Sequence, residues 1–220
     1  MASLKHDYAR LLNLARVKLP GSSDAAIKAE LFEVLHEFCN ETNVWWVDVP
    51  ITTVVGVNKY PVISSTPGEI VRLISLRDGD FNAWPASMPQ VPIIQLSQLP
   101  QQVSTVQVIT ARIAYVPGVP VTRDGETGSL PEIPEELLPL YAPNILDGLL
   151  GRMMAHISKP YSNERMSLYH LRRFRSALTA TRAAVLHQNS YGVNTWNYPQ
   201  GWRSTGQKGG VTGFSWGWGL

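Results

Sequence analysis

The stretch Asp24–Val57, DAAIKAELFEVLHEFCNETNVWWVDVPITTVVGV, contains the change of hydrophobic period that decides the fold. In its first half the apolar residues recur every three or four positions, which predicts an amphipathic helix. That helix would bury Ile27, Leu31, Val34, Leu35 and Phe38. Ser22 and Ser23 offer N-cap hydroxyls before it, and Asp24 suits the positive helix end. We therefore expect a helix that begins close to Asp24.

After Asn43 the period changes to two, which is typical of a half-buried strand. The alternating residues are Val47, Val49, Ile51, Thr53, Val55 and Val57. Pro50 interrupts this run and cannot donate to a sheet, so it predicts an edge strand or a bulge. The chain thus passes from a helical region into a β-rich region within a few residues.

Upstream, residues 3–18 carry a helical stripe, and Pro20-Gly21 predicts a short turn into the second helix, giving two antiparallel helices. Downstream, β-type runs cover Glu69–Arg77 and Thr105–Val116, with turn-prone pieces between them. The proline-rich stretch Trp84–Pro100 fits no pattern. A small antiparallel sheet with long irregular connections is the expectation for this region.

Helical spacing returns after Pro134, where Pro139 and Pro143 must start or kink a helix that Pro160 ends. A last helix is expected from Glu164 to about Gln188. Its candidate core residues are Met166, Leu171, Phe174, Leu178 and Leu186.

Together these patterns predict an α+β fold, mainly α, with a bundle of about four helices. Residues 1–45 and 134–190 would form the helical domain, residues 46–133 an inserted small antiparallel β-domain, and residues 191–220 an extended C-terminal tail.

Composition narrows the class of protein. The chain has 220 residues, 44% of them apolar, and one cysteine, which suits one or two soluble domains without an internal disulfide. No stretch has the roughly 18 to 20 apolar residues of a membrane span, and the first residues have no apolar signal core. A protein kept in a reducing cytoplasm is expected.

Charge is distributed unevenly along the chain. Residues 1–150 contain 10 Lys+Arg and 16 Asp+Glu, a net charge of −6. Residues 151–220 contain 9 Lys+Arg and 1 Asp+Glu, a net charge of +8. Such an imbalance favours a polyanion or an acidic protein partner.

The basic residues concentrate on the last predicted helix, at Arg165, Arg172, Arg173, Arg175 and Arg182. Arg172, Arg173 and Arg175 have three interpretations: a solvated helix face, a phosphate-binding surface, or partners for acidic residues across a subunit boundary. An acidic and a basic face on one small protein are also what head-to-tail self-association requires.

Residues that suggest catalysis or metal binding are few. The sequence has no phosphate-binding loop, metalloprotease motif, nucleophile elbow or C-x-x-C pair. His36 and Cys39 lie three apart, but a core thiol beside a boundary histidine is the simpler interpretation. Glu30, Glu33, Glu37 and Glu41 share a helix face, which indicates a solvated surface or an interface rather than a metal site. We expect no catalytic site, metal or cofactor.

The last 30 residues combine 8 of the 17 glycines with 4 of the 7 tryptophans. A glycine-rich segment buries too little side-chain area to offset the conformational entropy that it would lose on folding alone. Large aromatic rings, in contrast, are typical anchors for docking on a partner. The anchors are Trp196, Tyr198, Trp202, Phe214, Trp216 and Trp218. Single-stranded nucleic acid is a second candidate partner, but Arg203 and Lys208 supply few phosphate contacts. The third interpretation is that these residues form a low-complexity end that binds no partner.

The order of these elements resembles the head-to-tail adaptor (connector) proteins of short-tailed bacteriophages. The residues that carry the resemblance are Leu19-Pro20-Gly21-Ser22-Ser23-Asp24, Leu31-Phe32-Glu33-Val34-Leu35-His36-Glu37-Phe38-Cys39-Asn40-Glu41-Thr42-Asn43-Val44-Trp45, Tyr60, Glu69-Ile70-Val71-Arg72-Leu73, Leu146-Asp147-Gly148, Lys159-Pro160-Tyr161 and Arg173-Phe174.

The resemblance implies a structural protein of the virion, made in the host cytoplasm. Its subunits would form a ring, commonly of twelve, between the portal and the tail nozzle, with tail fibre proteins as further neighbours. Double-stranded DNA would pass transiently through the channel, and the C-terminal tail would grip the portal. Arg172, Arg173, Arg175, Glu33 and Glu37 would then lie at the ring interface or in the channel. The alternative is a nucleic-acid-binding module that uses the basic helix and the aromatic tail.

Overall fold

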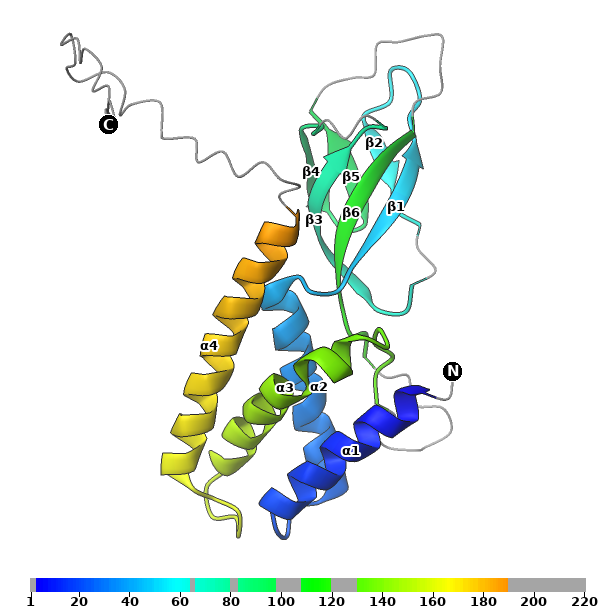
Figure 1. Ribbon diagram of the computed structural model, residues 1–220. Helices are drawn as coiled ribbons and strands as arrows, with labels where there is room; N and C mark the ends of the chain where they lie inside the picture. The colour runs from blue at the N-terminus through cyan, green and yellow to red at the C-terminus, as the bar shows by residue number, and fades with distance from the viewer. Residues whose placement is uncertain (1–2, 64–65, 80–82, 98–107, 120–129, 190–220) are drawn as a thin grey trace, which may run out of the picture.

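The computed structural model describes residues 3–63, 66–79, 83–97, 108–119 and 130–189, and its fold is α+β (Figure 1). Four helices form a bundle, and the β-strands lie at one end of it. The helices are α1 (Ser3–Lys18), α2 (Asp24–Thr42), α3 (Leu137–Met154) and α4 (Glu164–Asn189). The strands are β1 (Trp46–Thr52), β2 (Lys59–Pro61), β3 (Glu69–Arg77), β4 (Ala86–Gln90), β5 (Ile93–Leu96) and β6 (Val108–Val116).

Helix α3 is the centre of the bundle, because α1, α2 and α4 all pack against it. Two glycines permit this close approach. A Cβ atom at Gly148 would lie 2.7 Å from Cγ1 of Val34 and 2.9 Å from Cδ2 of Phe174, and one at Gly151 would lie 2.8 Å from Cγ of Leu171. The glycines therefore let α2 and α4 contact the backbone of α3 directly.

The predicted start of α2 is confirmed. Ser23 is its N-cap and accepts a hydrogen bond from the Ala26 amide at 3.3 Å. Gly21 adopts φ +80° in the preceding turn, and a Cβ there would lie 2.9 Å from Cγ of Pro160. The turn between α1 and α2 thus lies against the connection between α3 and α4. Helix α1 packs chiefly on α3 rather than along α2, and the Tyr8 hydroxyl donates to the Pro131 carbonyl at 3.0 Å.

The later helices depart in part from expectation. Pro143 does not start α3 but lies inside it, where its side chain is exposed. Met166 and Leu186 are exposed by 39% and 55%, so they are not core residues of α4. Phe174 is buried as predicted, and Leu171 and Leu178 are half-buried. The buried stripe of α4 also includes Val185 and three polar side chains, Ser167, His170 and Thr181.

The β-region contains two antiparallel sheets instead of the single sheet expected. One has the order β1-β6-β3, which makes β1 an edge strand and explains how it tolerates Pro50. The other has the order β2-β5-β4 and uses part of the proline-rich stretch that fitted no sequence pattern. Ile94 and Leu96 of β5 and Ile113 of β6 are almost fully buried in one core.

The core is continuous between the helices and the sheets. Trp45 joins α2 to β1, packs against Tyr115 of β6 at a ring distance of 6.0 Å, and accepts a hydrogen bond at its carbonyl from the Tyr115 amide. Across β1 and β6, Arg112 forms an ion pair with Asp48 at 2.7 Å. Among the helices of the described ranges, none has the length and apolar character needed to cross a bilayer.

Candidate functional site

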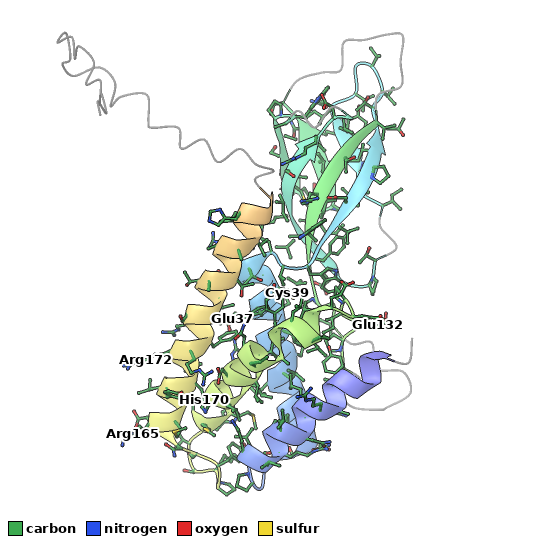
Figure 2. The ribbon with its side chains drawn as sticks, viewed as in Figure 1. Glu37, Cys39, Glu132, Arg165, His170 and Arg172 are labelled. Atoms are coloured by element: carbon green, nitrogen blue, oxygen red, sulfur yellow. The ribbon has the colours of Figure 1, made fainter. Side chains whose placement is uncertain are left out.

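The arginines of α4 fall into two groups. Arg165, Arg172, Arg175 and Arg182 are exposed, and Figure 2 shows Arg165 and Arg172 projecting from α4 away from the rest of the bundle. Arg173 instead contacts its own chain: its Nε lies 3.1 Å from Oδ2 of Asp147, and its Nη1 donates to the Tyr169 hydroxyl at 3.2 Å. The bond to Tyr169, followed by the charge of Asp147, raises the pKa of Arg173. The other four guanidinium groups present their charge to the surface.

A shallow groove of about 510 Å³ lies along this exposed side of α4. Its lining combines cationic, apolar and aromatic side chains: Arg165, Leu168, Tyr169, Arg172, Arg173 and Ser176. Leu168 and Tyr169 are each half exposed in the single chain. We call this surface the arginine groove. It offers charge for an anionic partner together with apolar area that a partner can bury.

The predicted row of glutamates on α2 is present, but part of it is paired within the chain. Arg152 of α3 donates from Nη2 to Oε2 of Glu37 at 2.5 Å, and its Nη1 lies 3.8 Å from Oε2 of Glu30. Glu33 and Glu41 are exposed. The net negative charge of this face therefore resides chiefly at Glu33 and Glu41.

Beside these carboxylates, Phe32 packs on His36 with a ring distance of 6.1 Å, and both side chains are half-buried. We call the exposed side of α2 centred on Glu33 the acidic face; Phe32 and His36 lie on one flank of it and Glu41 on the other. Like the arginine groove, it combines charge with aromatic area.

Sequence reasoning missed a buried polar cluster between α3 and α4. Nδ1 of His170 donates to Oδ1 of Asp147 at 2.8 Å, and these side chains are only 6% and 10% exposed. Ser167 Oγ donates to the Gly151 carbonyl at 2.7 Å. Figure 2 shows His170 on the side of α4 that faces the bundle. An aspartate within the apolar sequence Leu146–Leu150 was the available signal.

Ser167, His170 and Asp147 are the residue types of a hydrolase triad, but their arrangement is not that of a nucleophilic site. A triad needs the serine hydroxyl hydrogen-bonded to the histidine ring. The Ser167 hydroxyl instead donates to a backbone carbonyl, and His170 is directed at Asp147. The cluster therefore joins two helices, which fits the burial of its members.

Cys39 is equally unsuited to nucleophilic chemistry. Its side chain is fully buried, and burial raises the pKa of the thiol to about 12. A thiol with that pKa is protonated at neutral pH and is a poor nucleophile. Within the described residues, no group of three histidine, cysteine or carboxylate side chains is arranged to hold a metal ion.

The six predicted tail anchors, Trp196, Tyr198, Trp202, Phe214, Trp216 and Trp218, lie outside the described residues. Their docking role stays a prediction, as does the assignment of Arg172, Arg173, Arg175, Glu33 and Glu37 to a ring interface or channel. No protein-family model matches the chain, and no curated protein sequence is significantly similar to it.

Proposed function

We propose that this chain is a head-to-tail adaptor subunit of a short-tailed bacteriophage, a structural protein of the virion without enzymatic activity. Copies would form a ring between the portal and the tail nozzle, with twelve subunits as in the family it resembles. The genome would pass through the central channel. The observation that carries the proposal is the pair of oppositely charged helix faces, the arginine groove on α4 and the acidic face on α2.

Two different, complementary faces favour a ring. A contact between unlike faces of identical subunits repeats head to tail, and it closes when the rotation between neighbours divides a full turn. The bundle is a suitable scaffold, because α2 and α4 are both fixed against α3 by close packing at Gly148 and Gly151. The relative directions of the two faces are thereby set, as a closed ring requires.

The tail supplies the second part of the proposal. Residues 191–220 follow α4, and their aromatic anchors would bury large apolar rings on the portal protein. Nozzle or tail fibre proteins would contact the opposite side of the ring, and DNA would be a transient partner. This account places the finished protein in the virion after synthesis in the host cytoplasm.

The experiment for the tail is a truncation. A chain that ends at Ser190 should keep the helical circular dichroism of the full chain and fail to enter complexes with the portal protein. Co-sedimentation with purified portal rings measures this. Portal binding by the truncated chain at the affinity of the full chain would contradict the role of the tail.

The second candidate is a nucleic-acid-binding module, which the exposed arginines beside Tyr169 favour. Phosphate contacts release counterions, so binding by such a module falls steeply with salt. A filter-binding titration between low and physiological salt distinguishes the two. Tight binding that falls steeply as the salt concentration rises supports the module, whereas weak binding at physiological salt and a large oligomer support the adaptor.

A further inference from the structure

We propose that the arginine groove receives the acidic face of a second copy of this chain, so that Arg165 and Arg172 lie in the seam between subunits. This inference rests on the self-association in the proposed function and names the surfaces that perform it. It assigns these arginines to protein contact rather than to the DNA channel.

The composition of the groove favours a protein partner. Leu168 and Tyr169 are each 50% exposed, and Met166 beside them is 39% exposed. Phosphate groups bury little of such apolar area. Tyrosine, methionine and arginine are instead the residue types enriched at the centres of protein interfaces. A partner with both carboxylates and aromatic side chains can pair with the arginines and also cover the apolar part of the groove.

The acidic face has that composition. It brings Glu33 and Glu41 together with the half-buried pair Phe32 and His36. Along the helix axes the charge spacing is similar: Arg165 and Arg172 are seven residues apart, about 10.5 Å, and Glu33 and Glu41 are eight residues apart, about 12 Å. Around the axes the two arginines are nearly aligned, whereas the two glutamates are about 80° apart.

The two surfaces cannot meet within one chain. Helices α2 and α4 contact each other through their buried sides, where the rings of Phe38 and Phe174 are 6.3 Å apart. Glu33 and Arg172 are exposed, so they lie on other sides of the same helices. Figure 2 shows Arg172 projecting away from α2 and α3. Pairing of the groove with the acidic face therefore requires a neighbour, and the contact is of the head-to-tail kind.

A reciprocal charge reversal tests this pairing in the full chain. One variant carries Arg165→Glu with Arg172→Glu, a second carries Glu33→Lys with Glu41→Lys, and a third combines all four substitutions. Arg182→Glu, on the same helix but outside the groove, is the matched control. Association is measured by native mass spectrometry across a concentration series, with and without the portal protein, after circular dichroism has confirmed folding.

Like charges facing each other across an interface cost several kcal/mol, so each two-site variant should associate on the order of 100-fold more weakly than the wild type. The combined variant should recover association, because its groove is acidic and its α2 face basic. An equimolar mixture of the first two variants should also recover it, since each then meets an oppositely charged neighbour. Arg182→Glu should associate like the wild type.

The outcomes separate this inference from the proposed function. A wild-type chain that stays monomeric with and without portal refutes the ring itself. A wild-type ring that both two-site variants still form refutes only the assigned surfaces. Weakened association that neither the combination nor the mixture restores also refutes direct pairing. Loss of DNA binding in Arg165→Glu with Arg172→Glu, with ring formation intact, would place the arginines in the channel instead.

Discussion

Asp147 is the residue on which the junction of α3 and α4 most depends, and Asp147→Ala tests that dependence. Oδ1 of Asp147 accepts a hydrogen bond from Nδ1 of His170 at 2.8 Å, and Oδ2 lies 3.1 Å from Nε of Arg173. Removing the carboxylate leaves a buried histidine donor without its acceptor. A hydrogen bond to a charged group contributes about 1.5–3 kcal/mol, and the pair with the exposed Arg173 adds about 0.2–1 kcal/mol.

We therefore expect Asp147→Ala to lower the free energy of unfolding by about 2–4 kcal/mol, which for a chain of this size lowers the Tm by roughly 4–16 °C. Urea denaturation followed by far-ultraviolet circular dichroism measures the change. The matched control is Glu132→Ala, which removes an exposed carboxylate before α3 and should stay within about 0.5 kcal/mol of the wild type.

A double-mutant cycle with His170→Ala assigns the effect to the pair. The coupling free energy between positions 147 and 170 should be about 1–3 kcal/mol, because each single substitution removes the same hydrogen bond. A loss below about 0.5 kcal/mol for Asp147→Ala, or additive effects in the cycle, would show that the cluster does not stabilise the junction.

Three further predictions concern the core. Gly148→Val should destabilise the bundle by about 1–3 kcal/mol or more, since the new side chain meets Val34 and Phe174, and equal urea midpoints for variant and wild type would disprove the close packing. The Cys39 thiol has a pKa of about 12 in the folded chain and its ordinary value of 9.0 in the unfolded chain. As the pH rises from 9.0 toward about 12, only the unfolded chain loses this proton, so the free energy of unfolding falls. Cys39→Ala should therefore lose less stability than the wild type between pH 8 and pH 11, and parallel pH profiles would contradict this. Native Cys39 should also resist thiol reagents until the protein unfolds; rapid labelling of the folded chain would show that the thiol is accessible.

Much of the fold follows from local sequence signals. The start of α2 was predictable because Ser23 and Asp24 precede a clear apolar stripe, and strand β3 matches its predicted range because turn residues bound it on both sides. Pro50 predicted an edge strand or a bulge, since a residue without an amide proton is tolerated in either place, and β1 is an edge strand.

The second sheet was not predictable by the same means. Strands β2, β4 and β5 are three to five residues long, and β4 contains a proline, so neither alternation nor propensity identifies them. Their stability comes from pairing with one another and from the core, as the burial of Ile94 shows. Such tertiary stabilisation has no local sequence signal.

The candidate site was predicted in part. The sequence located the arginines on α4 and the glutamates on α2, because helical spacing assigns residues to faces. It did not reveal that Arg173 contacts Asp147 or that Arg152 pairs with Glu37, since both contacts join distant segments. The buried stripe of α4 was predicted only in part. Phe174 was identified, but Ser167, His170 and Thr181 are polar, and their burial depends on partners in α3 and on neighbouring residues of the bundle.

Native mass spectrometry of the full chain mixed with purified portal protein tests the adaptor account most directly. The account predicts a complex in which a closed ring of this chain, near twelve copies, is bound to the portal. A chain that remains monomeric and separate from the portal over the whole concentration range would contradict it.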